Sequence, residues 1–219
     1  MRTRKPAAER RQEIVKAVLR IIGERGLTSL TTSTVAEEVG VTSGALFRHF
    51  TSLDAILQEA VGYALFRIED TFPDPSLPPV ERLLQLARNR VRVLGSDPGL
   101  AWLLRSEQAY LTLPEEAVER LRDLVGRSKR FLLDAIREGV SQGAIRSDIE
   151  PEILLLPVMG TIHALVGMTG VHRLASGGRR PNLDRVLSAL QRILAAPEQA
   201  RRRQRGSKKA NTHRHANRR

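Results

Sequence analysis

The segment that most constrains this chain is TTSTVAEEVGVTSGALFRHF, residues 31 to 50. Its pattern predicts a short helix, a tight turn at Gly40 and a second short helix over Ser43 to His49, with Leu46 and Phe50 facing inward. Two helices joined by a tight glycine turn within about twenty residues form a helix-turn-helix, whose second helix can enter the DNA major groove. The motif therefore predicts a DNA-binding head.

Helical periodicity continues on both sides of this motif. Apolar side chains spaced by three and four residues predict a helix over 8–25, and another is expected over about 52–71 with Thr51 as its N-cap. The sequence PDPSLPP at 73–79 interrupts the pattern, because prolines lack amide donors and disfavour helical geometry in the residue before them. Further helices are expected at about 78–94, 98–110, 115–141, 151–174 and 183–195.

These elements predict an all-α fold of about nine helices. Only 4% of the residues are aromatic, and aliphatic residues with alanine favour helix packing over a β-sandwich. We expect an N-terminal three-helix DNA-binding domain over 1–54, with helix four as connector, and a larger C-terminal helical domain for ligand binding and dimerisation over 74–196. The remainder, 197–219, is predicted to be a disordered basic tail, because it lacks the apolar side chains that could offset the entropy of ordering.

The net charge of +12 is concentrated at the two ends of the chain. Residues 1–11 hold five basic side chains against one acidic, residues 197–219 hold nine against one, and the body between them holds 22 of each sign. Basic arms on a neutral body suggest a polyanionic partner, because neutralising phosphates releases counterions. Tails of this kind can equally be solubilising, so charge alone does not decide the partner.

The segment TTSTVAEEVGVTSGALFRHFTSLDAIL, residues 31–57, resembles the DNA-binding domain of TetR-type repressors, and the likeness extends over about 8–60. It is carried by the Gly40-Val41 turn, by Gly44, by the pair Leu46-Phe47 and by the ending His49-Phe50. The resemblance implies a homodimer whose larger domain binds a small-molecule effector and thereby alters the spacing of two recognition helices. A palindromic operator requires reading heads about 34–36 Å apart, which also implies a dimer.

The resemblance also implies which residues meet DNA. Ser43, Gly44 and Ala45 should reach base edges, and Arg48 either bases or phosphates. The expected backbone contacts and the cap of the second helix complete the set: Thr31, Thr32, Thr42, Phe47 and His49. The family usually has Tyr at position 47 and Lys at position 53, so Phe47 and Leu53 lack a phosphate-contacting hydroxyl and ammonium.

Two of these positions have alternative interpretations. Gly44 destabilises a helix by about 1 kcal/mol relative to alanine, yet it allows the backbone to approach DNA closely. His49 could be a half-buried residue whose charge suits the C-terminal end of a helix dipole, rather than a phosphate contact.

The stretch from Ile153 to Val171 holds nineteen residues without a formally charged side chain. A membrane span needs about 20 such residues, but Pro157, Gly160 and His163 lower the hydropathy and favour a close helix seam. We expect no membrane association and a homodimer interface built from 151–174 and 183–195. Within such a seam, His163 is interpreted first as a hydrogen-bonded core residue and second as a ligand contact.

Aromatic, thioether and basic side chains on the later helices are candidates for lining an effector pocket, although ordinary core packing explains each of them as well. Arg105 could pair with an anionic ligand, with Glu107 or with another carboxylate. The candidates are Trp102, Arg105, Tyr110, Phe131, Met159, His163 and Met168.

The sequence shows no catalytic or cofactor motif: it lacks a Gly-rich phosphate loop and a His-Glu-x-x-His pattern. With no cysteine, thiolate metal sites are excluded, and His213 and His215 alone make a poor metal site. We expect a cytoplasmic, non-enzymatic, sequence-specific transcriptional regulator of double-stranded DNA, most simply an effector-released repressor without a cofactor. The alternatives are a nucleoid-associated architectural protein and, more remotely, an enzyme in the C-terminal domain.

Overall fold

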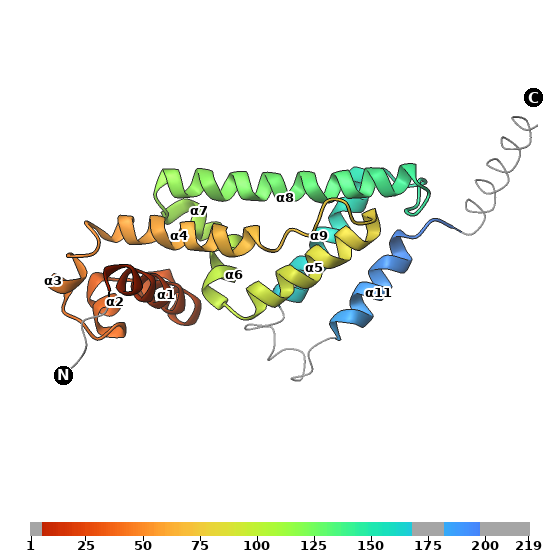
Figure 1. Cartoon of the computed structure of the whole chain (residues 1–219). Helices are drawn as coiled ribbons and strands as arrows, with labels where there is room; N and C mark the ends of the chain where they lie inside the picture. The colour runs from red at the N-terminus through yellow and green to blue at the C-terminus, as the bar shows by residue number, and fades with distance from the viewer. Residues whose placement is uncertain (1–5, 168–181, 198–219) are drawn as a thin grey trace, which may run out of the picture.

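The computed structural model describes residues 6–167 and 182–197, which form ten α-helices and one 3-10 turn. The helices build an elongated molecule, with α1 to α3 at one end and α5, α9 and α11 toward the other (Figure 1). The described parts contain no β-strand, only an isolated bridge between Ile145 and Ala195. The predicted all-α class is confirmed. The helices are α1 (Ala7–Arg25), α2 (Thr32–Glu38), α3 (Ser43–Leu46), α4 (Leu53–Glu69), α5 (Pro79–Gly95), α6 (Pro98–Arg105), α7 (Glu107–Thr112), α8 (Glu115–Ser141), α9 (Pro151–Gly167) and α11 (Leu183–Leu194), with the 3-10 turn η1 at Leu27–Ser29.

Three local predictions needed correction. The helix expected over 98–110 is two helices, because Ser106 is extended (φ −86°, ψ 122°) and separates α6 from α7. The N-cap of α4 is Ser52 rather than Thr51, since the Ser52 hydroxyl accepts from the Ala55 amide at 3.1 Å. The second helix of the motif ends at Leu46, and turns continue the chain to His49.

The apolar core forms two clusters that do not follow the break in the chain after α4. The first cluster joins α1 to α4 with α6, α7 and the N-terminal half of α8. The second joins α5, the C-terminal half of α8, α9 and α11. Since α8 runs beside α4 along the molecule (Figure 1), it contributes to both clusters. The domain division at 73–79 matches an irregular connection between α4 and α5, and it stays a prediction.

Helix α6 is pressed closely against α1 at two glycines. A Cβ atom built on Gly99 would lie 2.1 Å from the Leu19 carbonyl oxygen, and one built on Gly23 would lie 2.6 Å from the Gly99 nitrogen. Only residues without a side chain permit two backbones to approach so closely. The motif-bearing end of the molecule is therefore joined to α6 by a backbone contact.

The outer face of α9 carries an apolar stripe. Ile153, Leu156, Gly160 and Ala164 lie three to four residues apart and are exposed, while Leu155 and Val158 face the core. Among the described residues, no helix is both long and apolar enough to cross a membrane. The stripe is therefore a surface of the chain that apolar packing has not covered.

Candidate functional site

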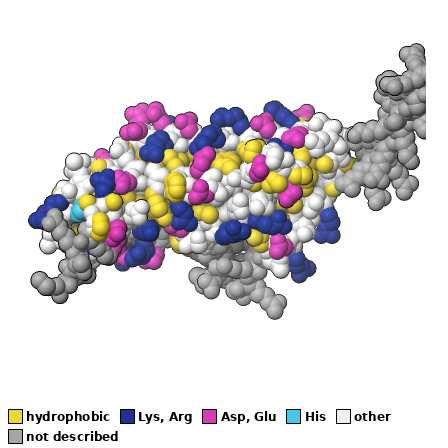
Figure 2. Space-filling model, viewed as in Figure 1, with side chains coloured by type: hydrophobic (Ala, Val, Ile, Leu, Met, Phe, Trp, Pro, Cys, Tyr) yellow, Lys and Arg dark blue, Asp and Glu magenta, His cyan; other side chains and the backbone are white. Residues whose placement is uncertain are grey.

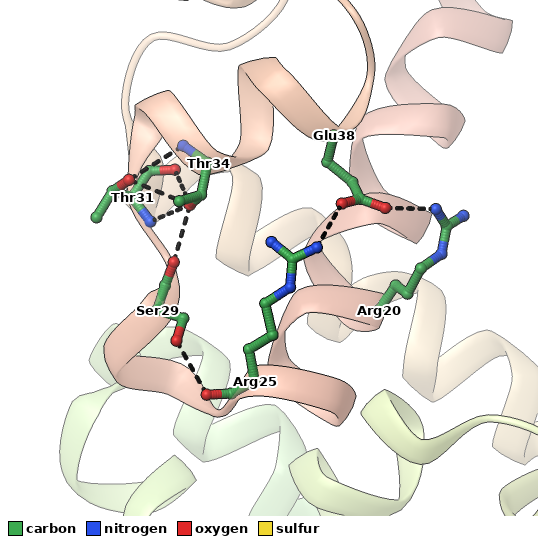
Figure 3. Close-up of polar contacts among 6 residues, drawn as sticks. All are labelled: Arg20, Arg25, Ser29, Thr31, Thr34 and Glu38. Carbon is green, nitrogen blue, oxygen red and sulfur yellow. Dashed lines mark hydrogen bonds and ion pairs between the residues drawn. The ribbon is translucent and has the colours of Figure 1, made fainter.

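The N-terminal end of α2 is held by a reciprocal cap (Figure 3). The Thr34 amide donates to the Thr31 hydroxyl at 3.1 Å, and the Thr31 amide donates to the Thr34 hydroxyl at 2.9 Å. The Thr34 hydroxyl also lies 2.8 Å from the Ser29 carbonyl oxygen, to which it can donate. This network satisfies amides at the helix start that have no partner within the helix. It orients the exposed Thr31 and the partly exposed Thr32.

The other end of α2 is tied to α1 by ion pairs (Figure 3). Glu38 contacts Arg20 at 2.6 Å and Arg25 at 3.2 Å. Surface pairs contribute only about 0–1 kcal/mol each, so their main effect is to fix the angle at which α2 leaves the core.

The turn and α3 are shaped by Gly40 and Thr42. Gly40 has φ of 67°, a left-handed conformation that suits glycine, and the Val41 amide donates to the Ala36 carbonyl at 2.9 Å. Thr42 is the N-cap of α3, since its hydroxyl accepts from the Ala45 amide at 3.2 Å. The predicted inward residue Leu46 is fully buried. A single rigid turn thus presents α3.

The residues predicted to meet DNA are all at least partly accessible. Phe47 is 48% exposed although it is a large apolar side chain. A Cβ atom at Gly44 would find no other atom within 4 Å, so packing inside the chain does not require glycine there. Thr31, Thr42, Gly44, Phe47 and Arg48 are exposed, and Thr32, Ser43, Ala45 and His49 are partly exposed.

Arg11 supports the motif from behind. It donates to the His49 carbonyl oxygen at 2.5 Å, pairs with Glu59 on α4, and lies 4.2 Å over the ring of Phe50. The sequence had placed Arg11 in a free cationic arm, whereas in the structure it is committed to contacts within the chain. Its neighbour Arg10 pairs with Glu13 at 2.9 Å. Residues 1–5 of the N-terminal arm and the basic tail beyond Pro197 lie outside the described residues.

A cavity of about 200 Å³ lies among α5, α6, α7, α8 and α9. Four of the predicted pocket residues line it: Arg105, Tyr110, Met159 and His163. Two others do not. Trp102 packs against the first core cluster, and the ring of Phe131 meets that of Phe72 edge to face at 5.3 Å. Met168 lies outside the described residues.

The residue that sequence reasoning missed is Arg90. It lines the cavity and is only 9% exposed. Arg90 lies four residues from both Leu86 and Leu94, which also line the cavity. This spacing places Arg90 on the apolar face of α5, and it is the sequence pattern that could have identified Arg90 as a buried residue. Arginine is so often a surface residue that this signal was overlooked.

The polar groups of the cavity are predominantly basic. The Arg90 guanidinium donates to the Ser128 hydroxyl at 3.0 Å. Burial lowers the pKa of Arg90 to about 10, against the opposing effect of Glu69, so the side chain stays charged at neutral pH. Burial and then the charges of Arg105 and Arg90 lower the pKa of His163. Burial raises the pKa of Tyr110, so its hydroxyl stays protonated.

His163 does not fit the interpretation as a hydrogen-bonded core residue. It is exposed on α9 at the edge of the cavity. Arg105 likewise packs against Gly167, where a Cβ atom would lie 2.8 Å from its guanidinium, and within the described residues it forms no ion pair with Glu107. Both side chains line the cavity.

A capped helix-turn-helix with an accessible second helix has the geometry of a DNA-binding head. Residues 14–60 match the family model described as bacterial regulatory proteins, tetR family. Over these residues the chain therefore carries a DNA-binding domain similar to that of the tetR family.

Similar proteins agree with this assignment. The repressor KstR2 of Mycolicibacterium smegmatis is 24% identical over 151 residues, which cover 67% of this chain and 73% of KstR2. The nucleoid occlusion factor SlmA of Vibrio campbellii is 27% identical over 161 residues, 70% of this chain and 80% of SlmA. The solved structure of AibR with isovaleryl coenzyme A and operator DNA has a TM-score of 0.69 at 18% identity, covering 84% of this chain and 97% of AibR.

Proposed function

We propose that this protein is a homodimeric, cytoplasmic transcriptional repressor that binds a palindromic operator and is released when a small molecule occupies the cavity. Residues 1–54 are its DNA-binding domain and 74–196 its regulatory and dimerisation domain. Ser43, Gly44 and Ala45 meet base edges. The DNA backbone is contacted by Thr31, Thr32, Phe47 and His49. Arg48 extends this surface.

The observation that carries the proposal is that α6 serves both sites. One end of α6 contacts α1 through Gly99, and the other end lines the cavity through Leu104 and Arg105. A molecule that displaces α6 must therefore disturb the contact between Gly99 of α6 and the backbone of α1. A ligand shifts such an equilibrium only by its difference in affinity for the two positions.

The apolar stripe on α9 supports the dimer. Leu156 is 63% exposed and Ile153 is 53% exposed, and Ile193 on α11 is exposed as well. Two copies of a self-complementary apolar face can pack as a four-helix interface. The crystallised AibR complex, which contains both an acyl-coenzyme A and operator DNA, supports the combination of effector and operator. We propose no catalytic role for the cavity, whose described lining offers no carboxylate beside His163.

The first experiment is selection of bound fragments from random duplex DNA at near-physiological salt. Recovery of one palindrome supports a specific dimeric regulator. Arg48→Ala and Ser43→Ala should then weaken operator binding by about 5- to 150-fold, the range of one base contact. Arg92→Ala, an exposed position on α5, is the control and should leave affinity unchanged. Equal effects of Arg48→Ala and Arg92→Ala would refute the assigned surface.

A second candidate function is architectural DNA binding without an effector. The similarity of this chain to SlmA, a nucleoid occlusion factor, favours this second function. On the face that Figure 2 shows, acidic and basic side chains are interspersed, and the excess of basic residues lies at the two ends of the sequence. We therefore expect architectural binding to depend on those ends. Fragment selection that recovers no motif, together with a salt slope that falls when the chain is truncated after Ala196, would support this function instead.

A further inference from the structure

We propose that the effector is a short-chain carboxylate, whose hydrocarbon chain fills the cavity and whose carboxylate is held by Arg90, Arg105 and His163. This inference rests on the proposed function, because it names the chemical class of molecule that the cavity accepts. It is carried by the size of the cavity, by its apolar wall and by the absence of any acid in its described lining.

The size and the wall select a small hydrocarbon. A cavity of 150 Å³ holds about one benzene molecule, so about 200 Å³ suits about six to eight non-hydrogen atoms. Aliphatic side chains from four helices surround this space: Leu86, Leu94, Leu104, Leu124, Ile162 and Val166. Burying a chain of five or six carbons against them is favourable because it removes apolar surface from water.

Arg90 selects an anion. Its Nε atom is buried without a hydrogen-bond partner, and in the described part of the chain no carboxylate lies within ion-pair distance of its guanidinium. The Nε atom of the other buried arginine, Arg82, is likewise without a partner, but the Arg82 guanidinium pairs with Glu138. Apart from Ser128, the guanidinium of Arg90 contacts the ring of Phe72, at 5.0 Å from its centroid. A buried guanidinium is stabilised by an opposite charge. Arg90 thus has an unused capacity for an anion that Arg82 has already filled.

Two further basic groups converge on the same space. Arg105 from α6 and His163 from α9 line the cavity, with Lys129 of α8 at an exposed position of the lining. Burial and, after it, the charges of Arg105 and Arg90 lower the pKa of His163, so part of this shift is repulsion among the basic groups. Glu69, whose charge acts on Arg90, is exposed, pairs with Arg127 at 2.9 Å and does not line the cavity. A carboxylate among the basic groups removes this repulsion.

The test is direct binding of hexanoate to the full-length protein, measured by calorimetry and without DNA. Hexanamide has the same shape but no charge, and should bind at least about tenfold more weakly, the effect of losing one charge-assisted hydrogen bond. NMR titration should show that hexanoate raises the pKa of His163. Equal affinity for hexanoate and hexanamide would overturn the proposal.

Variants separate the carboxylate site from general stability. Arg105→Gln, at an exposed position, should weaken hexanoate binding about tenfold or more and leave hexanamide unchanged. Arg90→Met should do the same, and Arg92→Gln is the matched control without effect. Tight binding of hexanoyl-coenzyme A that is independent of Arg90 and Arg105, with no binding of hexanoate, would contradict a carboxylate effector.

The proposed regulatory function and the proposed carboxylate site can be refuted separately. If hexanoate binds as expected but no DNA motif is recovered, the carboxylate site stands and the proposed regulatory function fails. If a palindrome is bound but calorimetry detects no hexanoate, the regulator stands and this inference fails. If both hold, hexanoate should release the operator fragment, and Arg105→Gln should shift the releasing concentration upward by the same factor as the affinity.

Discussion

Replacing Gly99 with alanine tests how tightly α6 is pressed against α1. The new Cβ atom would lie 2.1 Å from the carbonyl oxygen of Leu19 and 2.6 Å from its carbonyl carbon. Contacts of a Cβ atom below 3.0 Å are essentially never found. Because the opposing atoms belong to the backbone, no side-chain rotation can relieve the overlap, and the two helices must move apart by nearly 1 Å.

The expected cost follows from the behaviour of overpacked cores. Forcing extra atoms into a packed interior typically destabilises a protein by about 1–3 kcal/mol. For a chain of this size, 1 kcal/mol corresponds to roughly 2–4 °C in Tm. We therefore expect Gly99→Ala to lower Tm by about 2–12 °C. Operator affinity should fall as well, because α1 packs against α2 of the helix-turn-helix and is tied to it by the ion pairs of Glu38.

The assay is thermal unfolding followed by circular dichroism at one fixed protein concentration, since a dimer's Tm depends on concentration. Gly44→Ala is the matched control, because its Cβ atom meets nothing within 4 Å, and helix propensity predicts a gain of up to about 1 kcal/mol. An unchanged Tm for Gly99→Ala would refute the close approach of α6 and α1, and with it the coupling between cavity and motif.

Three other predictions concern single side chains. Arg11→Ala should cost about 1–2 kcal/mol in urea unfolding, because an ion pair, a hydrogen bond and a ring contact are lost, and a double-mutant cycle with Glu59→Ala should show a coupling of at most about 1 kcal/mol. The folded pKa of His163 lies below its unfolded value, so the unfolded state binds more protons and stability falls as pH drops through about 6.5. His163→Gln should flatten that part of the stability–pH curve, and an identical curve would contradict the assignment. Leu156→Glu should raise the dimer dissociation constant at least about tenfold in sedimentation, whereas Leu111→Glu, 82% exposed on α7, should not.

Local sequence was sufficient for the elements of the DNA-binding end. Caps such as Thr42, the positive φ at Gly40 and the burial of Leu46 depend on residues within one or two helical turns. Spacing and turn chemistry therefore identify them without knowledge of the rest of the chain. Where the prediction erred, at Ser52 and Ser106, neighbouring polar residues offered nearly equivalent caps or breaks, and small differences in packing selected one of them.

Contacts between distant segments could not be predicted from local spacing and turn chemistry. The spacing of residues on α5 places Arg90 on its apolar face, but it does not show that α8 and α9 pack over the guanidinium and enclose a cavity there. Gly23 and Gly99 become partners only when α6 folds back on α1. Arg11 reads as part of a cationic arm until Glu59 is placed beside it. The sequence by itself determined the helices, their caps and the DNA-binding motif, because each depends on short-range spacing; only the tertiary structure decided which charges are paired, which glycines touch and where the cavity lies, because those depend on the packing of segments far apart in the chain.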